Sequence, residues 1–205
     1  MLVAPAALDA ALHLAGCTRL FIDGGSNSGD AVRSFVDGRF FGCALNGPYR
    51  LYPTDWKAAT AAERRRRMAL LRQPEGWCIR SFEANSAFLP PLREEEVRLR
   101  SAGHDVRFIG AALSNLTSQH APRTITTFAR NKWGSTATTL PFEDIFPHNR
   151  PAPLRTHTEM GPSYDVQDVI ARAAHLNATI ALKLDVEGDE VPMIDQEMEP
   201  DEHRR

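Results

Sequence analysis

Carboxylate side chains stand at three points of the chain where a short apolar run ends. Asp23 follows the first of these runs, Glu83 follows the second, and Asp185 follows the third, with Glu187 two residues further on. Short apolar runs of this kind are typical of buried parallel strands. Open α/β sheets bind small molecules at the carboxyl ends of their strands, so these acids are candidates for binding ligand hydroxyls or for general-base chemistry.

A glycine-rich segment, Asp23-Gly-Gly25-Ser-Asn27-Ser-Gly29, directly follows the first apolar run. Glycine permits a tight turn and lets backbone N–H groups approach a ligand closely. Apolar residues at helical spacing follow over 30–36, so we expect a strand, a glycine turn and a helix. The spacing matches neither the dinucleotide fingerprint Gly-x-Gly-x-x-Gly nor the phosphate loop that ends in Gly-Lys-Ser/Thr. An ordinary tight connection between strand and helix is the alternative interpretation.

Glu83 ends the segment Trp77-Cys-Ile-Arg-Ser-Phe-Glu83, which is expected to form the neighbouring strand. A carboxylate at this position can accept two hydrogen bonds from the vicinal hydroxyls of a ribose and so orient a nucleoside. The alternative is a carboxylate that caps the following helix. Because Glu83 comes after the glycine turn in chain order, we favour the nucleoside interpretation.

The most acidic segment is Thr179-Ile-Ala-Leu-Lys-Leu-Asp185-Val-Glu187-Gly-Asp-Glu190. Four acids within six residues raise one another's pKa values in a dry site, since like charges disfavour ionisation. We expect Asp185, at the strand tip, to face the reacting groups, and Glu187 to orient a hydroxyl substrate or act as its base. A Mg²⁺ or Ca²⁺ site built from these oxygens is one alternative, and acids gathered at a helix N-terminus are another.

The composition predicts one domain that can bury a sizeable core, since the chain has 205 residues. Its net charge of −2 does not favour a nucleic-acid partner, and no apolar run is long enough to span a membrane. The alanine-rich start predicts a helix rather than a signal peptide. We therefore expect a cytoplasmic protein with reduced cysteines, and we interpret the glycosylation sequons as chance matches. The cysteines are Cys17, Cys43 and Cys78, and the sequons begin at Asn115 and Asn177.

The pattern along the chain predicts a mostly parallel sheet covered by helices. An insertion over 38–76 is expected to hold a helix that ends near Arg72, with the basic run at 64–67 on its solvated face. Residues 116–162 are expected to form an irregular loop, with a strand starting at Arg123 and with His148 and His157 incidental to function. The remaining expected elements are helices over 92–102 and 164–175 and strands over 106–115 and 179–185, the last beside 20–23.

Four of these segments resemble motifs of the FkbM family of S-adenosylmethionine-dependent methyltransferases, in the family's order. They are 23–29, Phe82-Glu-Ala-Asn85, the segment that ends Ala-Leu-Ser114-Asn115, and 182–190. The resemblance implies a Rossmann-like α/β fold, S-adenosylmethionine as cofactor, and methylation of oxygen on a sugar or small molecule. It assigns cofactor binding to Asp23, Gly25, Asn27, Gly29, Glu83, Ser114 and Asp185, and catalysis to Asp185 and Glu187, with no metal. The chain departs from the family at Ala84, Leu113 and Asn115.

The resemblance covers residues 19–191, after a helical segment over 1–18 and before a polar tail over 192–205. Members of the family continue with further strands, so we expect the sheet to lack its last strands. The alternative function is therefore a short cofactor-binding protein without turnover. A strand over 179–185 whose outer edge is uncovered would also template pairing with a second copy, so self-association is expected.

Overall fold

A four-stranded parallel sheet forms the centre of the protein in the computed structural model, which describes residues 5–39, 60–114, 123–131, 134–138 and 155–185. The strand order is β3-β2-β1-β9, and every neighbouring pair in it is parallel. The predicted α/β fold with a mostly parallel sheet is thereby confirmed, as is the pairing of the last strand with the first. The strands are β1 (Arg19–Gly24), β2 (Cys78–Phe82), β3 (Asp105–Ile109) and β9 (Thr179–Leu184).

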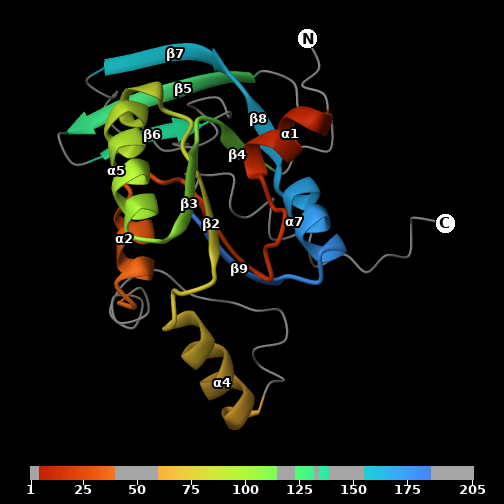
Figure 1. The fold of residues 1–205 in the computed structure, drawn as a ribbon. Helices are drawn as coiled ribbons and strands as arrows, with labels where there is room; N and C mark the ends of the chain where they lie inside the picture. Colours follow the sequence, from red (N-terminus) through yellow and green to blue (C-terminus); the bar gives the residue numbers. More distant parts are fainter. Residues whose placement is uncertain (1–4, 40–59, 115–122, 132–133, 139–154, 186–205) are drawn as a thin grey trace.

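Helices cover both faces of this sheet (Figure 1). Alternate side chains of β1 point to opposite faces, so Leu20 and Ile22 pack with α1 and α7, while Phe21 packs with α2 and α5. The result is a three-layer structure in which both sides of the sheet are apolar, as parallel sheets require. The helices of the two layers are α1 (Pro5–Leu12) and α7 (Val166–His175), and α2 (Asp30–Val36) and α5 (Leu89–Ser101).

The remaining elements extend the fold beyond the central sheet. Helix α4 (Ala61–Leu71) lies within the predicted insertion and ends close to the expected residue. A short 3-10 helix, η1 (Ser86–Phe88), joins β2 to α5. Three antiparallel strands in the order β6-β5-β7 lie at the end of the molecule where α5 begins (Figure 1). They are β5 (Arg123–Asn131), β6 (Gly134–Thr138) and β7 (Arg155–Gly161).

Two sequence predictions about this region are wrong. The single strand expected over 106–115 is divided at Gly110, and its second half, β4 (Ala112–Ser114), pairs with β8 (Ser163–Asp165) in a separate sheet. A β-carbon at Gly110 would lie 2.7 Å from the end of the Leu89 side chain, so a larger residue there would require that side chain to move. His157, expected in a loop, lies on β7, where it is paired with Thr127 across the antiparallel ladder.

The strand order places a topological switch point between β1 and β9. From β1 the chain moves in one direction to β2 and β3, and β9 is then added on the other side of β1. In open α/β sheets, the crevice at the carboxyl ends of the two strands on either side of this reversal is where ligands bind. The glycine turn follows β1 and Asp185 follows β9, so both lie at the switch point.

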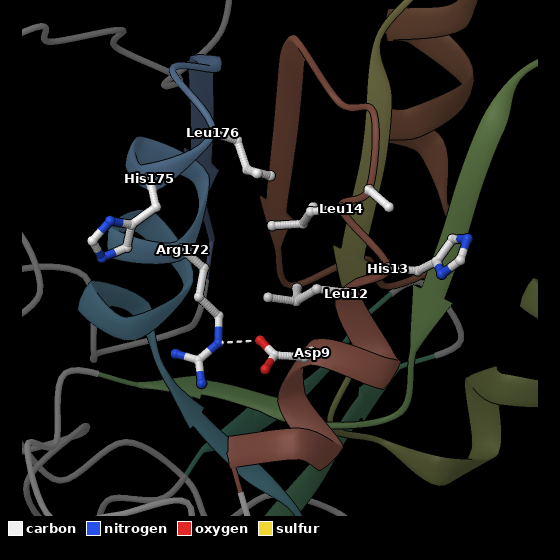
Figure 2. A pocket seen from close by; sticks show the side chains of 8 residues that line it. Asp9, Leu12, His13, Leu14, Arg172, His175 and Leu176 are labelled. Carbon is white, nitrogen blue, oxygen red and sulfur yellow. Dashed lines mark hydrogen bonds and ion pairs between the residues drawn. The ribbon is translucent and has the colours of Figure 1, made fainter.

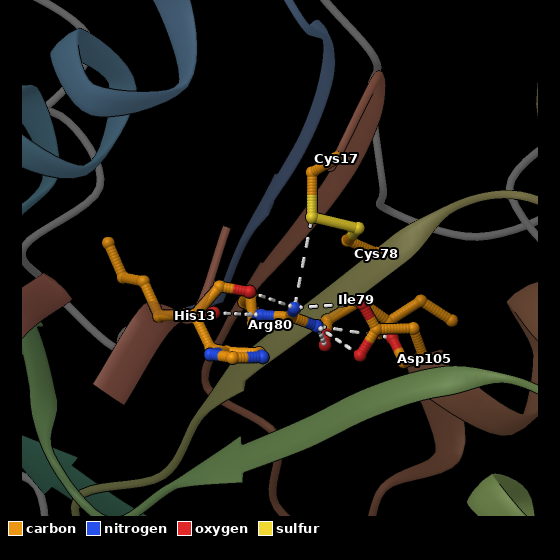
Figure 3. The surroundings of a disulfide bond; sticks show 7 residues. His13, Cys17, Cys78, Ile79, Arg80 and Asp105 are labelled. Carbon is orange, nitrogen blue, oxygen red and sulfur yellow. Dashed lines mark hydrogen bonds and ion pairs between the residues drawn. A yellow bond between two sulfur atoms is a disulfide. The ribbon is translucent and has the colours of Figure 1, made fainter. Parts of the chain in front are cut away.

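A disulfide and a buried arginine hold the opposite, amino end of the sheet (Figure 3). Cys17 is bonded to Cys78, so the expectation of reduced thiols is wrong for this pair. The pairing of Leu20 with Cys78 in neighbouring strands explains the bond, because it brings the residues just before β1 beside the start of β2. Since structural disulfides are typical of oxidising compartments, the cysteines no longer favour a cytoplasmic location.

Arg80 completes this end of the sheet. Its guanidinium is fully buried, forms an ion pair of 2.9 Å with Asp105, and donates hydrogen bonds to the carbonyl oxygens of Leu12 and His13. These carbonyls end helix α1 and have no partner within the helix, so Arg80 acts as its C-terminal cap. Among the helices that the structure describes, none has the length and apolarity needed to cross a bilayer.

Candidate functional site

The glycine turn closes tightly against the end of β9. Gly25 has a φ of +82°, and a β-carbon there would lie 2.0 Å from the backbone oxygen of Asp185, so only glycine fits. The N–H groups of Gly25 and Ser26 both donate to the carbonyl oxygen of Phe82, at 3.1 and 2.9 Å. The turn is thus held between β2 and β9, and it brings Gly25 and Asp185 together as the sequence predicts.

Asn27 and Gly29 complete the turn in left-handed conformations, with φ values of 50° and +84°. Asparagine tolerates this region better than most residues, which explains its place in a glycine-rich segment. Gly29 immediately precedes helix α2, and its N–H donates to the carbonyl oxygen of Ser26.

Glu83 lies directly beyond the end of β2, as predicted, and its side chain is buried. The N–H of Asn27 donates to one carboxylate oxygen at 2.6 Å, and the N–H of Asn85 donates to the other at 2.7 Å. Burial raises the pKa of Glu83 to about 7, although these two hydrogen bonds favour the ionised form. The turn therefore fixes the orientation of a carboxylate that takes up or releases a proton near neutral pH.

Asp23 is completely buried beneath the turn and is held by serines. Ser81 donates to Asp23 at 2.6 Å, and the hydroxyls of Ser81 and Ser26 lie 2.5 Å apart. Burial raises the pKa of Asp23, while its neighbours Lys183 and Ser81 oppose that rise. Asp23 consequently belongs to the framework under the turn rather than to its exposed surface.

Lys183 is a site residue that the sequence analysis missed. Its ammonium group lies 2.9 Å from Asp23, 3.6 Å from Asp185, and 2.8 Å from the carbonyl oxygen of Gly25. The signal in the sequence was a single lysine inside an apolar run. Since a lysine is almost never fully buried unless it is paired, its position there indicates carboxylate partners nearby.

Asp185 lies directly beyond the end of β9, where its side chain is 42% exposed. Its backbone N–H donates to the carbonyl oxygen of Gly24 at 2.9 Å, so it continues the pairing of β9 with β1. Glu187, the second predicted catalytic residue, lies outside the described residues.

Ser114 is buried on β4, where its hydroxyl lies 3.1 Å from that of Ser163. The hydrogen bond described for it thus joins β4 to β8 and is not made to the glycine turn or to Glu83. The role predicted for Ser114 in holding an adenine remains a prediction.

The proposed ligand chemistry can be compared with the donors and acceptors present. Each oxygen of Glu83 accepts one backbone hydrogen bond, and a carboxylate has about four acceptor positions in all. Two positions therefore stay available for a pair of vicinal hydroxyls. The alternative metal site was expected on Asp185 and the acids that follow it, and all of these except Asp185 lie outside the described residues. Within the described part of the chain, the only group of candidate metal ligands is Cys17, Cys78 and Asp105, and the two cysteine sulfurs of that group form the disulfide.

A separate hollow of about 340 Å³ lies between α1 and α7 and is also lined by the segment 13–15 that follows α1 (Figure 2). Its floor is apolar, with Leu12, Leu14 and Leu176, and an ion pair of 2.5 Å joins Arg172 to Asp9 at its rim. None of the predicted site residues lines it, so it is distinct from the site at the switch point.

Comparison of the chain with models of known protein families gave no match. Curated proteins and solved structures likewise gave no match.

Proposed function

We propose that this protein is an S-adenosylmethionine-dependent methyltransferase of the FkbM type that methylates a hydroxyl of a sugar or another small molecule. The observation that supports this most directly is the buried carboxylate of Glu83, oriented at both oxygens by backbone N–H groups beside the switch point of a parallel sheet. A carboxylate in this setting suits the vicinal hydroxyls of a ribose.

In this proposal, different residues bind different parts of the cofactor and the substrate. Glu83 accepts the ribose hydroxyls, and the turn from Gly25 to Gly29 provides the close backbone surface against which the rest of the cofactor lies. When bound, S-adenosylmethionine supplies an electrophilic methyl group for transfer to an oxygen. Asp185, at the exposed end of β9, accepts a hydrogen bond from the substrate hydroxyl, aligns its oxygen for in-line attack and takes up the proton that this oxygen loses when it gains the methyl group. Catalysis then comes mainly from positioning.

Calorimetry with S-adenosylhomocysteine, adenosine and NAD tests the proposal. We expect the first two to bind and NAD to bind at least tenfold more weakly. Glu83→Ala should weaken binding by about 1.5–3 kcal/mol, the value of a hydrogen bond to a charged group. Glu94→Ala, the same change at an exposed glutamate of α5, is the matched control and should leave affinity unchanged.

The outcomes separate the candidate functions. Equal affinity in the wild type and Glu83→Ala, with both proteins folded, would show that the nucleoside assignment is wrong. Tighter binding of NAD would favour an oxidoreductase. Binding without methyl transfer to any panel of sugars and small alcohols would favour the alternative of a cofactor-binding protein.

A further inference from the structure

Lys183 occupies a special position among the buried charges at the carboxyl end of the sheet. Three carboxylates gather there, from Asp23, Glu83 and Asp185, and Lys183 is the cation that the described residues place among them. Its side chain is only 9% exposed. A buried lysine is costly unless it is paired and hydrogen bonded, and Lys183 meets both conditions through groups of the candidate site.

The contacts of Lys183 are made to the backbone of the turn as well as to side chains. Its ammonium donates to the carbonyl oxygen of Gly25 at 2.8 Å and lies 3.4 Å from that of Gly24. It thereby connects β9 to the two residues at which β1 becomes the turn. An ammonium group has three donors, and acceptors from the Gly25 carbonyl, Asp23 and Asp185 surround it.

The turn carries this connection to Glu83. Two residues after Gly25, the N–H of Asn27 donates to the Glu83 carboxylate. A continuous path therefore runs from the ammonium of Lys183, through the carbonyl of Gly25 and the turn, to the carboxylate proposed to hold a ribose. Movement of the Gly25 peptide would move the donor that orients Glu83.

We infer that Lys183 is a positioning residue of the candidate site, which holds the glycine turn against β9 and keeps Glu83 oriented for a nucleoside. The inference rests on the proposed nucleoside site and adds to it a residue that touches neither ribose nor methyl group.

The electrostatics agree with this geometry. Burial raises the pKa values of Asp23 and Glu83, and the charge of Lys183 lowers both. The charged groups facing Lys183 in the described structure are Asp23 at the end of β1, Glu83 beyond β2 and Asp185 beyond β9. The direct effect of the Lys183 charge on Glu83 is smaller than that of the hydrogen bond from the Asn27 N–H. Replacement of Lys183 by a neutral residue should therefore raise the pKa of Glu83 mainly by displacing the turn and weakening that hydrogen bond, so that less of Glu83 is ionised at neutral pH.

The test uses three variants of Lys183 and one control. Lys183→Met removes the charge and the donors, Lys183→Gln keeps a donor without charge, and Lys183→Arg keeps the charge. Arg80→Met is the matched control, because it also removes a buried cation paired with an aspartate, on β2 at the other end of the same sheet. The first readout is the pH titration of Glu83 in the absence of ligand. It is monitored by nuclear magnetic resonance through the chemical shift of the Glu83 carboxyl carbon.

We expect the Glu83 titration to move to higher pH in Lys183→Met and Lys183→Gln, and to stay at the wild-type value in Lys183→Arg and Arg80→Met. The second readout is S-adenosylhomocysteine affinity at pH 7, which should fall about tenfold in the two neutral variants and recover in both at higher pH. An unchanged Glu83 titration in Lys183→Gln would overturn the inference, even if Lys183→Met fails to fold.

The two proposals fail in different ways. If the wild type binds no nucleoside, the proposed function is wrong, while the ligand-free titration still decides whether Lys183 controls Glu83. If the wild type binds a nucleoside and the neutral variants bind it equally well with an unmoved titration, the role of Lys183 is wrong and the function stands.

Discussion

The two ends of the parallel sheet bury charge in different ways. At the amino end, one arginine is surrounded by acceptors, and its partner Asp105 is half exposed to solvent, so neither charge is left without stabilisation. At the carboxyl end, Lys183 forms ion pairs with Asp23 and Asp185, while the hydrogen bonds described for Glu83 come from backbone N–H groups. Burial raises the pKa values of Asp23 and Glu83. The amino end is therefore arranged for stability. The carboxyl end holds acids whose burial is unfavourable, and a bound ligand could make their environment more favourable.

This contrast agrees with the binding of ligands at the carboxyl ends of the strands in α/β proteins. Strained turns and carboxylates with perturbed pKa values cluster at functional sites, where the strain and the pKa shifts contribute to binding or catalysis. Here the acids Asp23 and Glu83, whose pKa values are raised by burial, lie at the carboxyl end beside the glycine turn. Left-handed residues occur at both ends, with Gly16 and Gly103 at the amino end, so the acids and not the backbone conformation distinguish the two ends. The covalent crosslink lies at the other end, where it can stabilise the fold without entering the site.

The largest expected effect comes from removal of the disulfide. Replacement of Cys17 and Cys78 by serine should lower the free energy of unfolding by about 4 kcal/mol, the chain-entropy value for a crosslink between residues 61 apart. Denaturant unfolding measures this loss. If the two ends are independent, nucleoside affinity at low temperature should change less than twofold; a large loss of affinity would mean that the crosslink also shapes the site.

A change of pH should act mainly at the carboxyl end. The pKa of Glu83 is about 7 in the folded protein, against 4.5 for an unperturbed glutamate, so the folded state holds its proton more tightly than the unfolded state. The stability from this group is complete below pH 4.5 and is lost as pH rises through 7, a loss of about 3 kcal/mol at 1.36 kcal/mol per pKa unit.

Unfolding measured at pH 5 and pH 8 in the wild type and in Glu83→Gln checks this prediction, because glutamine does not ionise. The pH-dependent difference should shrink in the variant. Nucleoside affinity should change in the opposite direction and increase as pH rises through 7, since the ionised carboxylate is the better acceptor. Equal pH profiles for the two proteins would contradict the assignment of this titration to Glu83.

The smallest effect compares two glycines with the same backbone conformation at different ends. Gly16 has a φ of +81° and nothing within 4 Å of the place that a β-carbon would take, whereas a β-carbon at Gly25 would strike the backbone of Asp185. Gly16→Ala should cost about 1–2 kcal/mol, the strain of a left-handed residue. Gly25→Ala should cost clearly more, because the backbone of Asp185 must move away from the new β-carbon and its hydrogen bond to Gly24 is displaced.

Thermal and denaturant unfolding of both alanine variants, with calorimetry of ligand binding, makes this comparison. We expect Gly25→Ala alone to lose nucleoside binding. Equal effects of the two substitutions on the free energy of unfolding and on ligand affinity would show that the close approach of the turn to β9 contributes to neither.

The sequence was informative where local pattern and long-range structure agree. Apolar runs predict β1, β2 and β9, and the glycine spacing predicts the turn. Both predictions are possible because buried strands and left-handed backbone conformations each require particular residue types at their own positions. The position of Glu83 at the edge beside the turn followed from the same reasoning. These elements are the parts of the candidate site that could be predicted.

The remaining features depend on which strands become neighbours. The bond between Cys17 and Cys78 could not be inferred, because their proximity arises only after β1 and β2 pair in a fixed register. The role of Lys183 depends on the approach of β9 to the turn, and the division of the strand at Gly110 accompanies the pairing of β4 with β8, about 50 residues further along the chain. Each was missed because its cause lies in a distant segment.

The disulfide also makes a covalent ring of the chain from Cys17 to Cys78, with β1, α2 and α4 inside it. A single protease cut anywhere in that ring would leave both fragments joined until the bond is reduced. The starts of β1 and β2 would likewise stay together whatever the length of the connection between them. The ring can therefore accept insertions or deletions between its strands without separating the two residues, Asp23 and Glu83, on which the candidate site depends.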